Sequence, residues 1–472
     1  MEITSIASVR RKTVVNLLRT WRELTESARL KVTGKISPSV TKEDVEFLRE
    51  QMRECLNSKG GEVSARARTV ELGKTYLGLN DTGKARFLRV LAEDFDLDEE
   101  NLKQKIEAWH TAKKEDEKTR AEHEMRDAIE TPRSVILRQF NSLPNGFKFL
   151  VDLRSDLLAM ASKEPALKGL EYDLKQLLTS WFDVGLLDLV EITWNSPASL
   201  LEKLITYEAV HKIVSWDDLK NRLDADRRVF AFLHNKMPNE PLIFVHVALV
   251  KGLSDNVQEL LDQASPVMDI EDADTAIFYS ISNAQKGLVG ISFGNFLIKR
   301  VVDKITREMQ QIKHFSTLSP IPGFRAWLDP VLAKGDDAIF TPQELREVKS
   351  IKAGGSSGAL LLKEILDSTW HTDPKQTDKL KTVLVRLCAE YLMKEKKGKK
   401  AALDPVAHFH LTNGARLERI NWLGDTSGKG LKQSAGLMVN YYYDLADIDQ
   451  NHEKYATSGT IAASRAVKLL TK

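Results

Sequence analysis

The chain has 472 residues, of which 42% are hydrophobic and 29% charged, and its 69 basic and 67 acidic side chains leave a formal net charge of +2. This length and ordinary globular composition predict at least two domains. The near balance of charge disfavours a nucleic-acid partner, because nucleic-acid-binding domains usually carry a strong excess of basic residues.

Uncharged runs and cysteines exclude further classes of protein. The longest uncharged runs, such as 287–298, are shorter than the ~18 residues of a membrane-spanning helix, so we expect no membrane partner. Cys55 and Cys388 lie in different halves and support neither a disulfide framework nor a cysteine-based zinc site. The basic stretch Arg10-Arg11-Lys12 lacks an apolar signal core. An arginine-rich transit peptide is an alternative there, but a cytoplasmic location is expected.

The residues up to about 182 have a helical pattern. Thr41-Lys42-Glu43-Asp44 is typical of a capping box before an apolar stripe, and Asp81 is expected to cap a second helix with Phe87, Leu88, Val90 and Leu91. Residues 99–130 are rich in Glu, Lys and Ala, which favours a solvated or partner-binding helix. We predict an all-helical domain over residues 1–182 that serves packing and homo-oligomerisation and holds no catalytic residue.

Strands enter the pattern after about residue 183. Short runs of β-forming residues predict strands at 229–233, 242–249 and 276–281. A helix is predicted over 296–311, and another from Thr341, where Thr-Pro-Gln-Glu combines a cap, a first-turn proline and a reaching glutamate. Eight of the ten histidines lie in this half. Residues 183–472 are therefore predicted to form a mixed α/β domain that carries the chemistry.

Three motifs resemble known sites but lack the expected context. Residues 354–358 fit G-x-S-x-G, yet a helix rather than a strand is predicted before them. Residues 424–430 resemble a P-loop that is one spacer short, with Gly430 in place of the metal-binding hydroxyl. His408 and His410 are expected on one face of a strand, without a third ligand, so no metal site is expected.

A strand, a glycine-rich turn, a helix and a second strand follow one another between residues 276 and 324. Gly287, Gly290 and Gly294 occupy the turn. Glycine lets the backbone approach an anion closely, and the start of a helix offers free N–H groups, so this layout is typical of pyrophosphate binding. A tight turn that needs glycine only for its backbone conformation explains the same spacing, and the pattern alone does not decide between the two.

Longer motifs in this half resemble the malonyl-CoA decarboxylase family. The resemblance spans about residues 190–472. The motifs are Thr193-Trp194-Asn195-Ser196-Pro197, Glu208-Ala209-Val210-His211, Phe278-Tyr279-Ser280-Ile281-Ser282, Phe296-Leu297-Ile298-Lys299-Arg300-Val301-Val302, Leu318-Ser319-Pro320-Ile321-Pro322-Gly323-Phe324, Phe409-His410-Leu411, Asn413-Gly414-Ala415, Arg419-Ile420-Asn421-Trp422 and Gly436-Leu437-Met438-Val439-Asn440-Tyr441. It implies an α+β protein, with an all-helical N-terminal domain followed by an acetyltransferase-like (GNAT-type) mixed α/β catalytic domain.

The resemblance also implies site residues. Ser319 and His410 would be the catalytic pair, Tyr443 would act with them, and Lys203 would be an accessory residue. The turn for the CoA pyrophosphate would comprise Val289, Gly290, Ile291, Ser292, Phe293, Gly294 and Asn295. Some members carry Glu at the position of Ser292, so no argument from a carboxylate there transfers. Taken alone, His410 would be interpreted as a core histidine and Ser319 as a turn residue.

The implied reaction converts malonyl-CoA to acetyl-CoA and carbon dioxide. Because the thioester accepts the electrons of the broken bond, we expect no metal and no cofactor, with coenzyme A entering as part of the substrate. His410 suits the role of general acid at the enolate. A CoA-dependent acyltransferase and a non-catalytic CoA-binding scaffold are the alternatives. The basic stretch 394–400 is interpreted as a solvated loop, or as a contact to a substrate phosphate.

Overall fold

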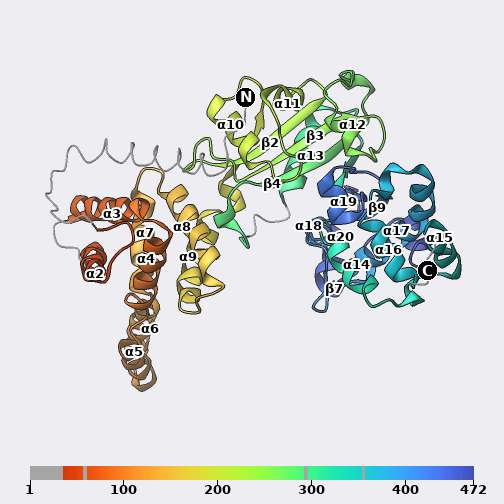
Figure 1. Ribbon diagram of the computed structural model, residues 1–472. Helices are drawn as coiled ribbons and strands as arrows, with labels where there is room; N and C mark the ends of the chain where they lie inside the picture. Colours follow the sequence, from red (N-terminus) through yellow and green to blue (C-terminus); the bar gives the residue numbers. More distant parts are fainter. Residues whose placement is uncertain (1–35, 57–60, 292–295, 353–356) are drawn as a thin grey trace. The chain divides into compact units, whose positions relative to one another are not determined.

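The computed structural model describes residues 36–56, 61–291, 296–352 and 357–472 (Figure 1). The chain divides into two compact units. The first contains the residues up to Asp188 together with two later segments, Leu233–Leu242 and Asn283–Phe293. The second contains Leu189–Phe232, Ile243–Ser282 and Gly294–Lys472. Two short pieces of the strand-containing half thus belong to the first unit.

Helices build the first unit, which confirms the predicted all-helical N-terminal region. An aromatic cluster lies at its centre: the rings of Tyr76 and Phe87 have centroids 4.9 Å apart, and Phe140 and Phe149 lie 4.8 Å apart. Buried aromatic side chains of this size dominate the energetics of a core. The helices are α2 (Lys42–Leu56), α3 (Gly61–Gly78), α4 (Asp81–Glu93), α5 (Glu99–Thr111), α6 (Glu115–Ile129), α7 (Pro132–Gln139), α8 (Gly146–Ala161) and α9 (Leu167–Trp181).

The helix starts predicted from the sequence are partly confirmed. Asp44 accepts a hydrogen bond from the backbone N–H of Thr41 at 2.8 Å, as expected at the start of α2. The cap predicted at Asp81 is wrong, because Asn80 caps α4 through the N–H of Gly83 and Asp81 is already helical. Residues 99–130 form two helices, α5 and α6, and only Ala121 of the pair is buried. Figure 1 shows this hairpin extending away from the other helices of its unit.

A mixed sheet organises the second unit, which confirms the predicted α+β class. Its strands run in the order β1-β2-β3-β4-β5-β10-β6, and β9 pairs with β10. All three strands predicted from the sequence are present, as β2, β3 and β4. The strands are β1 (Leu187–Ile192), β2 (Arg227–His234), β3 (Ile243–Val250), β4 (Thr275–Asn283), β5 (His314–Thr317), β6 (Ser319–Pro320), β9 (Arg416–Asn421) and β10 (Met438–Tyr442); β7 (Lys396–Lys397) and β8 (Ala401–Ala402) form a separate hairpin.

The predicted strand, turn, helix and strand are found as β4, the residues after it, α13 and β5. β4 and β5 are parallel, with Phe278 opposite Thr317. α13 connects them, as a parallel pair requires. The other helices of this unit are α10 (Ala198–Tyr207), α11 (Trp216–Asn221), α12 (Val257–Leu261), α13 (Phe296–Glu308), α14 (Phe324–Leu332), α15 (Pro342–Ile351), α16 (Gly358–Leu366), α17 (Pro374–Lys394), α18 (Pro405–Thr412), α19 (Gly428–Ser434), α20 (Ile448–Ser458) and α21 (Arg465–Leu469).

Candidate active site

Ser319, His410 and Tyr443 form a hydrogen-bonded row in the second unit. His410 Nε2 lies 3.1 Å from Ser319 Oγ, and His410 Nδ1 lies 2.7 Å from the Tyr443 hydroxyl. All three side chains are buried. The His410 ring also stacks on Tyr441, with centroids 4.5 Å apart. The fold thus brings His410 into direct contact with Ser319, 91 residues before it, and with Tyr443, 33 residues after it.

Strand β10 assembles this row. It pairs with β6 so that Val439 lies opposite Ser319, and it continues to Tyr443, whose N–H donates to the carbonyl of Phe315. Thr317 completes the arrangement: its Oγ1 accepts from the Tyr441 N–H at 3.1 Å and from the Ser319 hydroxyl at 2.8 Å. The register of β10 with β9 shifts between Asn440 and Tyr441, and after this irregularity Tyr441 and Tyr443 both contact the His410 ring.

Asp404 is a site residue that the sequence reasoning missed. Its Oδ1 accepts from the N–H groups of Val406 and Ala407 and caps α18, the helix of His410. Its Oδ2 accepts from the N–H of Gly323, four residues after Ser319, at 3.1 Å. Asp404 therefore connects the segments that carry the two members of the pair. Asp404-Pro405 is a helix-start signal that was available in the sequence.

The strand predicted around His408 and His410 is wrong. Both lie on α18, where residues two apart face different sides. His408 Nδ1 bonds the Tyr455 hydroxyl at 2.8 Å, whereas His410 faces Ser319 and Tyr443. The expected pair of neighbouring histidines therefore does not exist. Among the described residues, no group of three or more His, Cys, Asp or Glu side chains could hold a metal ion.

Burial controls the protonation of this site. It lowers the pKa of His410 to about 3, because an imidazolium there would lose its hydration. It raises the pKa of Tyr443 well above the usual range of a tyrosine. Both groups are therefore neutral near pH 7, and the imidazole carries one proton. This differs from the expectation of a histidine that titrates near physiological pH.

The described start of the predicted CoA turn belongs to the first unit. Val289 and Gly290 are exposed, Ile291 is buried, and Gly290 has φ of +75°, a conformation that favours glycine. Gly287 lies against α8, since a β-carbon there would approach the carbonyl oxygen of Val151 to 1.7 Å. The remaining turn residues, Ser292, Phe293, Gly294 and Asn295, lie outside the described residues.

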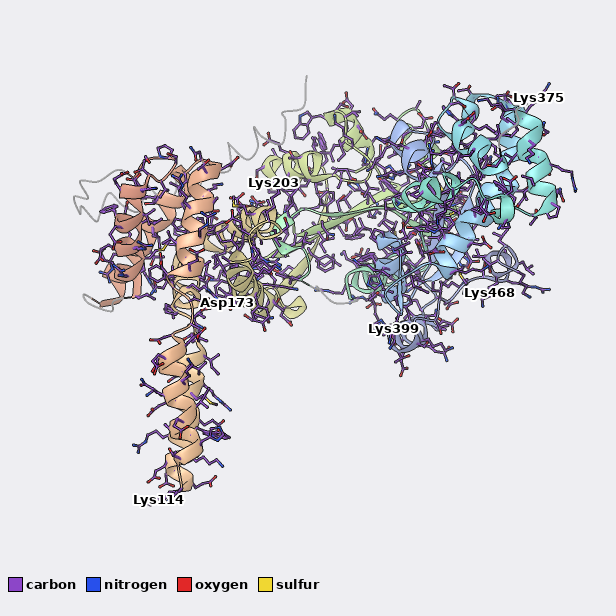
Figure 2. All side chains as sticks on the ribbon, turned by 60° about the horizontal axis from the view of Figure 1, so that its bottom comes forward. Lys114, Asp173, Lys203, Lys375, Lys399 and Lys468 are labelled. Atoms are coloured by element: carbon purple, nitrogen blue, oxygen red, sulfur yellow. The ribbon has the colours of Figure 1, made fainter. Side chains whose placement is uncertain are left out.

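The two basic candidates occupy separate elements of the second unit. Lys203 lies half-buried on α10, and Figure 2 labels it there. The basic stretch 394–400 runs from the last residue of α17 through β7 to the turn before β8, where Figure 2 labels Lys399. Lys396 Nζ donates to the carbonyl of Gly459. A role of either candidate in substrate binding stays a prediction.

The G-x-S-x-G and P-loop-like motifs lie in a structural context that does not fit the sites that their patterns resemble. α15 precedes residues 354–358, so the strand that a nucleophile elbow needs is replaced by a helix; residues 353–356 themselves lie outside the described residues. In the P-loop-like motif, Ser427 caps α19 and Lys429 Nζ donates to the carbonyls of Ala209 and Val210. That lysine is committed to protein oxygens rather than to a phosphate.

The motif that begins at Glu208 forms a buried polar cluster. The carboxylate of Glu208 accepts from Ser280 Oγ at 2.7 Å and from the N–H groups of Val210 and His211, and it lies 3.3 Å from His246 Nε2. Burial alone would raise the pKa of Glu208, but His246 and these hydrogen bonds outweigh it and lower the pKa to about 2. The ionised carboxylate therefore ties the segment after α10 to β3 and β4.

Family models match most of the chain. Residues 185–472 match the malonyl-CoA decarboxylase C-terminal domain, and residues 95–182 match the malonyl-CoA decarboxylase N-terminal domain. The chain belongs to the malonyl-CoA decarboxylase family. The resemblance inferred from the motifs is thereby confirmed, and it extends into the helical half, where no motif had been recognised.

Individual members of the malonyl-CoA decarboxylase family are similar to this chain over most of their length. The mitochondrial malonyl-CoA decarboxylases of Anser anser anser and Mus musculus are 40% and 38% identical, over 85% and 83% of this chain and 83% and 82% of their own lengths. The crystal structure of malonyl-CoA decarboxylase from Rhodopseudomonas palustris covers 90% of this chain and 99% of that one, with 41% identity and a TM-score of 0.81. The structure from Agrobacterium vitis covers 90% and 100%, with 39% identity and a TM-score of 0.79.

Proposed function

We propose that the chain decarboxylates malonyl-CoA to acetyl-CoA and carbon dioxide, with Ser319, His410 and Tyr443 as its catalytic residues. The observation that carries the proposal is the buried Ser319–His410–Tyr443 row in a chain of this family. A row of hydroxyl, imidazole and phenol can hold and move a proton, and burial excludes competing water.

The reaction breaks the bond between C2 and the carboxylate carbon of the malonyl group. Carbon dioxide leaves, and the bonding electron pair passes into the thioester as an enolate. A preorganised hydrogen-bond donor stabilises the negative enolate oxygen, and loss of one such donor typically costs about 3 kcal/mol. Ser319 supplies this donor when its hydroxyl turns from Thr317 to the substrate.

His410 then delivers a proton to C2 of the enolate. Because the Ser319 hydroxyl donates to Thr317, its oxygen accepts from the Nε2–H of His410, and Nδ1 accepts from the Tyr443 hydroxyl. As the Nε2 proton moves to C2, Nδ1 takes the proton of Tyr443. After the product leaves, a solvent proton enters at Nε2 and the Nδ1 proton returns to Tyr443. The imidazole is neutral before and after the step. This relay suits a histidine whose burial disfavours the imidazolium.

The pH dependence of turnover tests the relay. The folded pKa of His410 is lowered to about 3, so its neutral form persists at every pH above that value. We expect kcat to be nearly constant between about pH 5 and pH 8 with respect to this group. An enzyme that needed an imidazolium with the ordinary pKa near 6.5 would lose about tenfold per pH unit above it. A tenfold fall of kcat per unit above pH 6.5 would contradict the relay.

Turnover of malonyl-CoA alone tests the proposed activity. Purified protein treated with a chelator is expected to release acetyl-CoA and carbon dioxide in equal amounts from malonyl-CoA, without an acyl acceptor. A requirement for an added amine would favour the acyltransferase alternative, and CoA binding without turnover would favour a scaffold. Activity that is lost in chelator and restored by one divalent ion would contradict the expected independence of metal.

Three finer features belong to the same proposal. The parallel β4–β5 pair connected by α13 supports an acetyltransferase-like catalytic domain. The sparsely buried α5–α6 hairpin supports assembly through the helical domain, and light scattering that shows a monomer would contradict it. No helix within the described ranges is long and apolar enough to cross a membrane. A cytoplasmic location stays a prediction, since the curated relatives compared above are named as mitochondrial enzymes.

A further inference from the structure

The neutral imidazole of His410 can carry its proton on either ring nitrogen. Burial lowers its pKa to about 3, so near pH 7 one nitrogen donates and the other accepts. Nε2 lies 3.1 Å from Ser319 Oγ, and Nδ1 lies 2.7 Å from the Tyr443 hydroxyl. Only the tautomer with its proton on Nε2 can pass that proton to C2 in the proposed relay. The groups that select this tautomer are therefore part of what turnover requires.

Thr317 directs the hydroxyl proton of Ser319 away from His410. Its Oγ1 accepts from Ser319 Oγ at 2.8 Å and from the N–H of Tyr441 at 3.1 Å. A hydroxyl oxygen has two lone pairs, and these two donors use both. With its own proton on Thr317, Ser319 Oγ accepts from His410, so the imidazole proton lies on Nε2. The Thr317 side chain is completely buried, so water does not compete for these bonds.

The opposite tautomer would leave buried hydrogen-bonding groups without partners. With the proton on Nδ1, the imidazole would donate to the Tyr443 oxygen, and Ser319 would donate to Nε2. Thr317 Oγ1 would then lose one of its donors. No other acceptor for the Tyr443 hydroxyl lies among the residues that the structure describes. An unpaired buried hydroxyl is costly, because it has lost water without gaining a protein partner. The contacts at this site therefore favour the proton on Nε2.

Asn440 of β10 holds the backbone of Thr317. Its Nδ2 donates to the carbonyl of Thr317 at 2.7 Å and to the carbonyl of Ser254 at 3.0 Å. Its Oδ1 accepts from Arg419 Nε at 3.1 Å and from Asn421 Nδ2 at 2.9 Å. All hydrogen-bonding groups of this buried amide are therefore paired. Because the β-branched side chain of Thr317 has few rotamers, a fixed backbone also fixes its Oγ1.

We propose that Thr317 is a positioning residue of this site, which takes the hydroxyl proton of Ser319 and so keeps the proton of His410 on Nε2. Thr317 acts through Ser319 and needs no contact of its own with the substrate. The inference rests on the proposed function, since it takes the Nε2 proton as the one that reaches C2. After each turnover, the same hydrogen bond favours the tautomer that the next turnover requires.

Thr317→Val tests the tautomer, because valine has the shape of threonine but cannot accept a hydrogen bond. Nitrogen NMR of histidine-labelled protein distinguishes the two tautomers, and His410→Gln identifies the signals of His410. We expect the proton on Nε2 alone in the unmodified protein. In Thr317→Val we expect a mixture, because either tautomer then leaves one hydroxyl proton unpaired. Thr317→Ser supplies the acceptor again and should restore Nε2–H. A proton on Nδ1 in the unmodified protein, or on Nε2 alone in Thr317→Val, would overturn the proposal.

Ser316→Ala is the matched control for the loss of a buried hydroxyl from β5. The Ser316 hydroxyl donates to the backbone carbonyls of Thr317 and Tyr441. This variant should keep Nε2–H, and so should Tyr443→Phe, in which Thr317 still holds the Ser319 proton. A tautomer mixture in either control would overturn the role of Thr317. Where Thr317→Val does not fold, Thr317→Ala removes the same acceptor from a smaller side chain and should give the same mixture.

Kinetics separate this inference from the proposed function. In Thr317→Val, kcat/KM for malonyl-CoA should fall about 2- to 10-fold, because part of the free enzyme has no proton on Nε2. It should recover in Thr317→Ser and stay unchanged in Ser316→Ala. An unchanged kcat/KM in a Thr317→Val protein with mixed tautomers would overturn the positioning role. If the unmodified protein does not turn over malonyl-CoA, the proposed activity fails, and the tautomer populations still decide whether Thr317 sets the proton of His410.

Discussion

Alanine at His410 or at Ser319 is expected to lower kcat by about 10²- to 10⁴-fold, the range that positioned acid–base groups contribute. The two side chains share one hydrogen bond, so their losses should not add. The double variant should be little slower than the slower single variant. CoA affinity should remain, because neither side chain belongs to the predicted CoA turn. Steady-state kinetics and calorimetric CoA binding measure both quantities.

His408→Ala is the control for this pair. His408 lies on the same helix but bonds Tyr455 instead of Ser319. It should keep most of its turnover, which would show that loss of a histidine from α18 is not damaging in itself. Near-normal kcat in His410→Ala would end the proposed mechanism. Loss of CoA binding in a folded His410→Ala protein would move this residue from catalysis to binding.

Gly287→Ala is expected to lower the free energy of unfolding by about 3 kcal/mol or more. The added β-carbon would lie 1.7 Å from the carbonyl oxygen of Val151, so the turn must move away from α8. That movement would also break the contacts of Arg154 to the carbonyls of Gly287 and Val289. KM for malonyl-CoA should therefore rise in the same variant. Urea denaturation and steady-state kinetics provide the two measurements.

Gly78→Ala is the corresponding control, because a β-carbon at this helical glycine meets nothing within 4 Å. Its stability should stay within about 1 kcal/mol of the unmodified protein. Equal stability of the Gly287→Ala and Gly78→Ala proteins would contradict the close packing of the turn against α8.

Local signals in the sequence were sufficient for the architecture. The β-forming runs at 229–233 and 276–281 became β2 and β4, and the capping box at Thr341 starts α15 as expected. They were insufficient for α18, where the alternation in His408-Phe409-His410 favoured a strand. There the cap supplied by Asp404 and the packing of His410 against Tyr441 decide the structure. The sequence pattern of a short segment can thus fit either a helix or a strand, and its tertiary contacts decide between the two.

The site itself was accessible only through the family resemblance. Ser319, His410 and Tyr443 are far apart in sequence, and no spacing rule joins them. The lowered pKa of His410 follows from burial, which a sequence does not display. Gly287 was expected in a turn that fits either pyrophosphate binding or a tight backbone conformation, whereas the structure explains it by the close approach of Val151. The contacts of Arg154 with the carbonyl oxygens of Gly287 and Val289 could not be predicted, because these residues lie 133 and 135 positions later in the chain.

The composition of the two units has a consequence for biosynthesis. Domains generally fold from the N-terminus as the chain is made. Here the helical unit includes Leu233–Leu242 and Asn283–Phe293, so it cannot close until the ribosome has passed these segments. The Ser319–His410–Tyr443 row can form only later in synthesis, since β10 (Met438–Tyr442) must first pair with β5 and β6. The nascent chain therefore exposes β5 and β6 without their neighbour β10, and we expect it to depend on chaperones more than a chain of two consecutive domains would.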